Sequence, residues 1–281
     1  MTTSHLPPKA YKNNEFLNSP AARHIRIMTE YEEPRQRFLK YGVQHTIVFF
    51  GSARTMSSED AKAHLTATQD RVARHETPDD PTLQKELRKA EIADRMSIYY
   101  DASRTLAAKL TAWSMERHGN RRYLVSSGGG PGIMEAANRG AADVPGGRSV
   151  GLGISLPFEQ GVNRYVTPEL AFEFHYFFTR KYWFLYLCKG LVVFPGGFGT
   201  LDELFETLTL VQTRKIRKRL PVLMFGNRDY WSKVFNFQAM ADFGTISPED
   251  LDLIHFTDDV DEAFAYLSRE LADIENDGEA M

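Results

Sequence analysis

A glycine-rich turn followed by a carboxylate is the strongest sign of chemistry in this sequence. The turn consists of Pro195, Gly196, Gly197, Phe198, Gly199 and Thr200. It joins an apolar, β-branched run at residues 191–194 to an amphipathic helical pattern that carries Glu203 near its start. A strand that leads through such a turn into a helix presents free backbone N–H groups to a phosphate. We therefore predict that the turn binds a phosphate and that the Glu203 carboxylate lies beside the attached sugar.

A structural alternative exists for the same residues. Thr200 and Glu203 have the spacing of a capping box, in which a hydroxyl and a carboxylate three residues later satisfy N–H groups at a helix start. Capping alone, however, does not require three glycines and a proline in the five residues before Thr200. We therefore favour the functional interpretation.

A second glycine turn follows another predicted strand, at residues 123–127. It contains Gly128, Gly129, Gly130 and Gly132, and the helical pattern after it begins with Met134 and Glu135. The first predicted strand, residues 46–50, runs into Gly51 and Ser52, which form either an ordinary turn or one wall of a nucleotide site at the carboxyl ends of the strands. Two glycine turns in one domain are stronger evidence for such a site than one.

An aromatic segment, residues 172–188, is predicted as one helix that is apolar on most sides. Such a helix belongs either in the core or in a subunit interface. Arg180 and Lys181 stand in its middle. Because a buried charge is costly unless it is paired, we expect an anionic partner for Arg180, either Glu203 or a bound phosphate.

These motifs resemble those of the LOG ("lonely guy") family, the cytokinin riboside 5′-monophosphate phosphoribohydrolases. The family signature Pro-Gly-Gly-x-Gly-Thr-x-x-Glu is matched from Pro195 to Glu203, and its Gly-Gly-Gly-x-x-Gly-x-Met element from Gly128 to Met134. The resemblance covers residues 46–257. The Glu-Ala-Ala-Asn sequence that starts at Glu135 is typical of the longer bacterial members.

The resemblance implies roles for individual residues. Arg180 and Glu203 would be catalytic, and Lys181 would complete the Arg-Lys pair of the family. Glu159 and Gln160 would lie near the substrate, although a simple polar loop is an equal alternative for them. The remaining substrate-binding residues would be those of the two glycine turns, with Gly51, Ser52, Met134 and Glu135.

The implied reaction is hydrolysis of the N-glycosidic bond of a nucleoside 5′-monophosphate, either AMP or an N6-modified AMP. The products would be a free base and ribose 5-phosphate. Such bonds break through a cationic sugar, so the Glu203 carboxylate could stabilise that charge or activate water. Arg180 would either hydrogen-bond to the departing base or orient Glu203 and the sugar hydroxyls. No cofactor or metal is expected.

Three other functions are alternatives to this one. Molybdenum-cofactor carrier proteins resemble the LOG family and would bind a phosphorylated pterin without turnover, but the combination of Arg180 and Glu203 favours an enzyme. A general dinucleotide-binding protein is a weaker alternative, because the first strand ends in Gly-Ser-Ala-Arg rather than Gly-x-Gly-x-x-Gly. A lysine decarboxylase would need a lysine for a pyridoxal Schiff base, and no sequence feature marks one.

The length of 281 residues suits a single α/β domain with additions. The resemblance implies a Rossmann-like, doubly wound parallel sheet flanked by helices, and a homodimer or dimer-based hexamer. We predict an N-terminal arm with a helix (residues 1–45), a main domain (46–275) with a helical insertion at about 55–96, and an acidic tail (276–281). A crossover helix is predicted at 97–117, with Ile98, Ala102, Leu106 and Leu110 facing inward.

The composition and charge of the chain indicate its cellular compartment and its classes of partner. A net charge of −3 argues against a nucleic-acid-binding surface, and Cys188 is the only cysteine, as in proteins of a reducing compartment. No signal peptide and no apolar stretch long enough to cross a membrane is evident. We therefore expect a cytoplasmic protein that does not associate with membranes.

Overall fold

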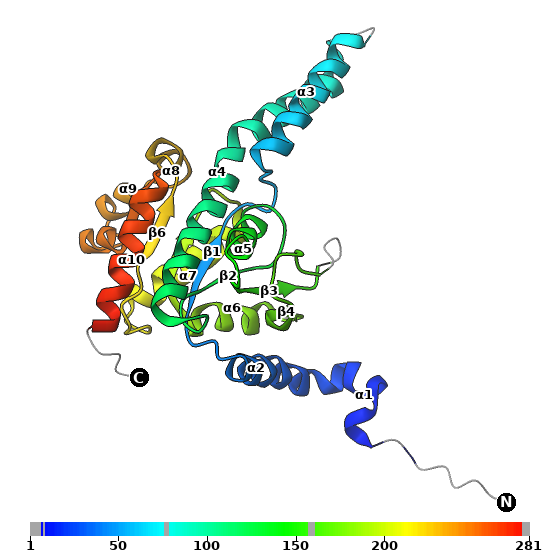
Figure 1. The fold of residues 1–281 in the computed structure, drawn as a ribbon, viewed down its shortest axis with the longest axis vertical. Helices are drawn as coiled ribbons and strands as arrows, with labels where there is room; N and C mark the ends of the chain where they lie inside the picture. The colour runs from blue at the N-terminus through cyan, green and yellow to red at the C-terminus, as the bar shows by residue number, and fades with distance from the viewer. Residues whose placement is uncertain (1–6, 8, 76–78, 157–160, 277–281) are drawn as a thin grey trace, which may run out of the picture.

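A seven-stranded, entirely parallel sheet forms the centre of the computed structural model, which describes residues 7, 9–75, 79–156 and 161–276 (Figure 1). The strand order is β4-β3-β2-β1-β5-β6-β7. The strands are β1 Thr46–Phe50, β2 Leu124–Ser127, β3 Ser149–Ile154, β4 Ala171–Phe174, β5 Cys188–Val193, β6 Val222–Phe225 and β7 Ile254–Thr257.

Helices cover both faces of this sheet, as the sequence predicts for a doubly wound, Rossmann-like fold. They are α1 Asn14–Asn18, α2 Arg23–Lys40, α3 Ser58–Arg74, α4 Pro81–His118, α5 Ile133–Ala142, α6 Phe177–Tyr186, α7 Phe198–Gln212, α8 Arg228–Val234, α9 Phe237–Asp242 and α10 Val260–Asn276.

The central strand β1 divides the core into two layers. Ile47 and Phe49 point into the layer formed with α4, α5 and α10, whereas Val48 and Phe50 point into the layer that contains α6 and α7. All five residues of β1 are buried, which explains why the strand is a continuous apolar run rather than an alternating one.

The chain changes direction in the sheet between β1 and β5. From β1 it proceeds through β2 and β3 to β4 at one edge, and it then returns to place β5 on the other side of β1. The connections on the two sides of this point therefore diverge at the carboxyl ends of β1 and β5. In open α/β sheets this is where ligands bind.

The predicted insertion and crossover helix are joined in the structure. Helix α4 runs without interruption from Pro81 to His118, and α3 packs against its N-terminal half (Figure 1). Pro81 occupies the first turn, and Asp80 caps the helix by accepting hydrogen bonds from the N–H groups of Thr82 and Leu83 at 2.8 and 3.0 Å. With 38 residues, α4 is about 57 Å long, so the α3–α4 hairpin projects beyond the sheet.

The predicted inward face of this helix is partly wrong. Leu106 and Leu110 are buried as expected, but Ile98 is 60% exposed. The buried side of α4 instead includes Ser97 and Ser103, and the Ser103 hydroxyl donates to the carbonyl of Ile133 at 3.3 Å. The small Ser103 side chain fits the close contact with α5, and the Ser97 hydroxyl lies 3.0 Å from that of Ser58 in α3. Apolar periodicity does not identify such buried polar positions.

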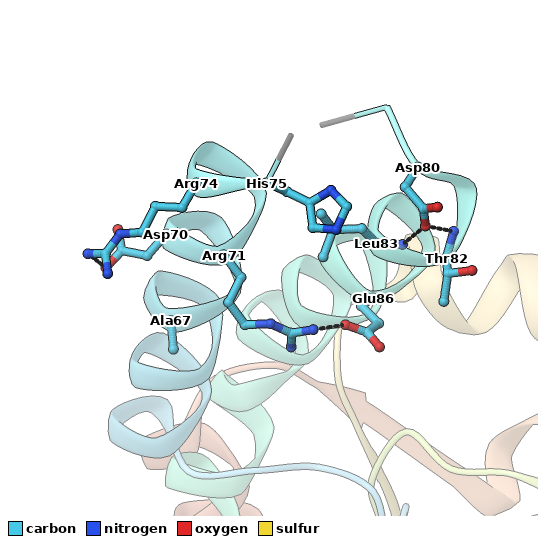
Figure 2. A pocket seen from close by; sticks show the side chains of 9 residues that line it. All are labelled: Ala67, Asp70, Arg71, Arg74, His75, Asp80, Thr82, Leu83 and Glu86. Atoms are coloured by element: carbon cyan, nitrogen blue, oxygen red, sulfur yellow. Dashed lines mark hydrogen bonds and ion pairs between the residues drawn. The ribbon is translucent and has the colours of Figure 1, made fainter. Parts of the chain in front are cut away.

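The tip of the hairpin contains a hollow of about 630 Å³ that is separate from the glycine turns (Figure 2). Its charged side chains pair with one another: Arg71 binds Glu86 at 2.9 Å, and Asp80 is engaged in the helix cap. The hollow lies at the far end of the hairpin from the sheet (Figure 1), so it is remote from both glycine turns.

The aromatic segment 172–188 is not one helix, contrary to the prediction. Its first residues form the edge strand β4, residues 175 and 176 make the turn, and only Phe177–Tyr186 is helical, as α6. Cys188 already belongs to β5. The connection between β4 and α6 is so short, with neither glycine nor proline, that no breaker marks it.

Two further boundaries differ from the prediction. The sequence pattern predicts one helix at residues 229–241, but these residues are divided between α8 and α9. It predicts the helix of the N-terminal arm near residues 21–31, whereas α2 continues to Lys40 with Pro34 inside it. Within the residues that the structure describes, no helix is both long and apolar enough to cross a membrane.

Candidate active site

Three loops meet where the sheet changes direction, and backbone hydrogen bonds tie them together. The N–H of Ser52, in the loop after β1, donates to the carbonyl of Pro195 at 3.0 Å. The N–H of Ile133, at the start of α5, donates to the carbonyl of Ser52 at 3.1 Å. The structure thus brings both predicted glycine turns to the same edge of the sheet, with Gly51 and Ser52 between them.

Some of the glycines are explained by packing within the protein. A Cβ at Gly132, where φ is +70°, would overlap the carbonyl oxygen of Ser52, and one at Gly51 would lie 2.6 Å from the Ile133 side chain. A Cβ at Gly196 would overlap the Thr200 hydroxyl. A Cβ at Gly129, where φ is +70°, would lie 2.7 Å from the Val162 side chain. These four positions need glycine to fold.

Gly197 and Gly199 are different. Neither has a positive φ, and a Cβ at either position would meet no protein atom within 4 Å. They flank Phe198, whose side chain is 95% exposed. Since neither packing nor backbone conformation requires glycine there, close approach of a ligand to the backbone is the remaining reason for it.

The N-terminus of α7 is open, and the capping-box alternative is wrong. The helix begins at Phe198, and its N-cap is Gly197, which has no side chain to accept a hydrogen bond. Thr200 is consequently the third helical residue and Glu203 the sixth, so the carboxylate lies too far along the helix to cap it. The first N–H groups of α7 are therefore available to an anion at the end of β5.

Glu203 is a buried carboxylate, and one of its two oxygens has no hydrogen-bond partner among the described residues. Its side chain is only 5% exposed, and its Oε2 atom accepts no hydrogen bond from any residue that the structure describes. Burial raises the pKa of Glu203 to about 7, although the charges of Lys181 and Arg180 oppose the shift. The negative charges of Glu206 and Asp202 act in the same direction as burial. A carboxyl group of this kind is typical of a catalytic site.

The second glycine turn is shaped around Arg180. The Nε–H of Arg180 donates to the carbonyl of Leu152 in β3 at 2.6 Å, and its guanidinium lies 4.9 Å from the centre of the Phe184 ring. A Cβ at Gly128 would lie 2.6 Å from Nη2 of Arg180 and 2.7 Å from the Met134 sulfur. Gly128 is thus required for the position of Arg180, whose positive charge reaches Glu203.

Lys181 joins α6 to α7. Its ammonium group lies 2.8 Å from Asp202 and 2.7 Å from Glu206, two carboxylates one helical turn apart. Burial alone would lower the pKa of Lys181, but these hydrogen bonds outweigh it and raise the pKa. The ion pairs fix the two helices that carry Arg180 and Glu203. A direct contact of Lys181 with substrate stays a prediction.

The remaining residues predicted to bind substrate differ in where they lie relative to the glycine turns. Glu135 lies in the first turn of α5 and accepts a hydrogen bond from the Tyr100 hydroxyl at 2.9 Å, so it is oriented toward α4. Gly130 is part of the turn, and its carbonyl accepts a hydrogen bond from Asn163 at 3.1 Å. Glu159 and Gln160 lie outside the described residues.

A buried amide network behind the second turn was not predicted. The Asn138 side-chain oxygen accepts hydrogen bonds from the Ser127 hydroxyl at 2.7 Å and from the Asn163 amide at 2.9 Å. The Ser127 hydroxyl in turn accepts a hydrogen bond from the N–H of Gly129 at 3.0 Å. The network holds the turn that contacts Arg180. The one available signal was Asn138 itself, a polar residue on the apolar face of α5.

The fold and the site together define a Rossmann-like α/β protein with a buried carboxylate, influenced by the charge of a nearby arginine, at the change of strand direction. Residues 134–267 match the model of a family described as "Possible lysine decarboxylase", which is the family of the LOG proteins. This part of the chain, which contains Arg180 and Glu203, is similar to that family. No curated protein matches the chain. The resemblance is confirmed at the level of the family, and the longer bacterial type stays a prediction.

The raised pKa of Glu203 predicts how the stability of the folded protein depends on pH. In the folded protein the Glu203 carboxyl has a pKa of about 7, whereas its ordinary pKa is 4.5. Between these two pH values the folded state binds more protons than the unfolded state, so the free energy of unfolding falls as pH rises from 4.5 to about 7. Glu203→Gln removes the titration. We expect the free energy of unfolding of wild type, relative to the variant, to fall by an amount on the order of 3 kcal/mol between pH 4 and pH 8.

Urea unfolding of both proteins across this pH range measures the difference. The wild-type and Glu203→Gln curves share every other titrating group, so the variant is its own control. Parallel curves would show that Glu203 titrates near its ordinary pKa.

Proposed function

We propose that the protein is a nucleoside 5′-monophosphate phosphoribohydrolase, which hydrolyses the N-glycosidic bond of AMP or an N6-modified AMP. The observation that carries the proposal is the buried carboxylate of Glu203, whose Oε2 accepts no hydrogen bond from the described residues, one turn inside a helix whose N-terminus is open to an anion. The family supports a phosphoribohydrolase-like activity at this site.

The phosphate would bind at the start of α7, where the exposed Gly197 and Gly199 leave the backbone accessible. The helix dipole and the free N–H groups favour a dianion at this position. From there Glu203 lies about one turn along the helix, which is comparable to the distance from a 5′-phosphate to the ribose ring. The phosphate would thus align the glycosidic bond with the carboxylate.

Glu203 would act in its ionised form. A carboxylate in a site of low polarity stabilises a developing oxocarbenium charge more strongly than it would in water, and it can accept the proton of the attacking water. With a pKa of about 7, it is a stronger base than an ordinary glutamate and is still substantially ionised at neutral pH. Arg180 cannot donate its proton, so its role would be to hydrogen-bond to the departing base or to orient Glu203.

The description of the family as a possible lysine decarboxylase does not fit this site. A pyridoxal Schiff base requires an amine that can lose its proton, and Lys181 is the lysine beside Glu203. Its ammonium group is bound by two carboxylates that raise its pKa. This pairing stabilises the charged form, which is the unreactive one, so Lys181 is not suited to form a Schiff base.

The first test is activity on matched substrates. We expect release of adenine and ribose 5-phosphate from AMP or an N6-substituted AMP, and a kcat/KM for adenosine that is at least about 100-fold lower, because adenosine lacks the phosphate that aligns it. Quantification of base and ribose 5-phosphate by chromatography measures both. Equal values would show that the turn is not the phosphate site. Tight binding of a phosphorylated pterin without any base release would favour the carrier alternative.

A second test addresses Glu203. We expect Glu203→Gln to lower kcat by roughly 10²–10⁴-fold, because the amide is neither a base nor a negative charge. AMP binding, measured by calorimetry, should largely survive, since the phosphate contacts α7 elsewhere. The wild-type kcat should decline as pH falls below about 7, the pKa of Glu203. A folded variant with near-normal kcat would remove Glu203 from the mechanism.

We also propose that a second copy of the chain covers the outer face of α6. Phe178, Tyr182 and Tyr186 are exposed and recur every fourth residue, so they form one stripe on the helix. Trp183 and Phe184, in contrast, are buried against the protein's own core. The family resemblance implies a homodimer or dimer-based hexamer, and this stripe is the surface that fits it.

Sedimentation tests the assembly. We expect wild type to sediment as a dimer or larger, and Phe178→Glu to shift it toward monomer because a charge enters an apolar contact. Phe243→Glu is the control, since Phe243 is also an exposed phenylalanine but lies beyond α9, away from the stripe. A fully active wild-type monomer at assay concentration would contradict the proposal.

A further inference from the structure

The N-terminal arm, which had no predicted chemistry, contacts the helix that carries Arg180. Helix α2 runs beside α6 (Figure 1). Trp183 of α6 lies between two rings of α2, with centroid distances of 5.9 Å to Tyr31 and 5.5 Å to Phe38. The arm is therefore packed onto α6 through aromatic contacts.

A single carboxylate of α2 binds the start of α6. Oε1 of Glu30 accepts a hydrogen bond from the N–H of His175 at 2.7 Å. Its Oε2 accepts from the N–H of Tyr176 at 3.3 Å and from the Thr179 hydroxyl at 2.6 Å. The backbone carbonyl of Glu30 also accepts a hydrogen bond from the Trp183 indole at 3.0 Å.

Helix α6 has no cap of its own. Its N-cap residue is Tyr176, which makes no side-chain capping hydrogen bond, and the first turn contains no acidic residue. Helix starts need acceptors for their free N–H groups, and a negative charge there is favoured by the helix dipole. Glu30 supplies a negative charge there, and acceptors for the N–H groups of the N-cap residue and the residue before it, from a different helix 145 residues earlier in the chain.

The start of α6 determines where its two cations lie. Arg180 is one turn from the cap, and its N–H donates to the carbonyl of Tyr176 at 3.3 Å. From this position its guanidinium reaches Leu152 in β3, and the neighbouring Lys181 reaches Asp202 and Glu206 in α7. A displacement of the first turn of α6 would move both side chains relative to Glu203.

We propose that Glu30 is a positioning residue of the active site: by capping α6 from α2, it holds Arg180 and Lys181 at their places beside Glu203. Glu30 makes no contact with the reacting atoms and acts through α6. The inference rests on the proposed function for its effect on catalysis, but its effect on Glu203 can be measured without turnover.

The charges around Glu203 give the proposal a specific consequence. The cations that face it are Lys181 and Arg180 from α6, and the anions are Glu206 and Asp202 from its own helix α7. Only the cations depend on the cap. If the start of α6 loosens, the anions stay in place and the carboxylate loses part of its stabilisation, so Glu203 should bind its proton more tightly.

The test compares Glu30→Gln with Glu32→Gln. The first variant keeps the length of the side chain but replaces one acceptor oxygen with an N–H donor, which cannot accept from the helix start. Glu32 is a matched control, because it lies on the same helix, is half-exposed and pairs only locally with Arg35 and Gln36. The carboxyl signals of ¹³C-labelled glutamate are followed by NMR as a function of pH, and Glu203→Gln identifies the signal of Glu203.

We expect Glu30→Gln to raise the titration midpoint of Glu203 by about half a pH unit or more, and to lower kcat by roughly 10-fold or more through misplacement of Arg180. The acid limb of the kcat profile should move to higher pH by the same amount. Glu32→Gln should leave all three unchanged. An unchanged Glu203 midpoint in folded Glu30→Gln would overturn the inference.

A second variant tests the same contact in case Glu30→Gln does not fold. Thr179→Val removes the hydroxyl that donates to Glu30 and leaves the carboxylate in place, so we expect a smaller upward shift of the same midpoint. No shift in this variant would also overturn the inference. If wild type proves to hydrolyse no nucleotide, the proposed function fails, whereas the NMR titration still decides the role of Glu30.

Discussion

A buried carboxylate with an unsatisfied oxygen is the feature on which the arrangement around the site depends. Removing Glu203 from water is unfavourable, and the compensating charge comes from one side only, since both nearby cations lie on α6. The cations are in turn fixed by contacts to three different elements: the β3 carbonyl that binds Arg180, the α7 acids that bind Lys181, and the Glu30 cap. Displacing α6 therefore changes the ionisation of Glu203.

The glycines of the two motifs serve different purposes, although the sequence pattern treats them alike. Gly128 makes room for Arg180, and Gly132 lets the start of α5 approach Ser52. Gly197 and Gly199 have no such constraint from the protein. A signature of this kind thus combines residues that build the site with residues that leave it open, and only the second group points directly to a ligand.

The sequence predicted the central fold well, because its strands are buried on both faces and the glycines mark their ends. Strand β1 was predicted to the residue. Strand β4 was missed because it passes into α6 through two residues without a breaker. The inward face of α4 was partly wrong because Ser97 and Ser103 occupy buried positions where apolar residues were expected. The local sequence pattern of a helix does not show which other helix will pack against each of its faces.

The same limit explains why the sequence located Arg180 and Glu203 but not the groups that hold them. Motif spacing describes residues that are close in the chain, such as Thr200 and Glu203. The cap of α6 joins residues 30 and 175, and the network around Asn138 joins residues 127, 138 and 163. Each member of these sets is an ordinary polar residue in its local context. Its significance depends on a partner that only the folded chain supplies, and for this reason an arm without a motif can still determine the electrostatics of the site.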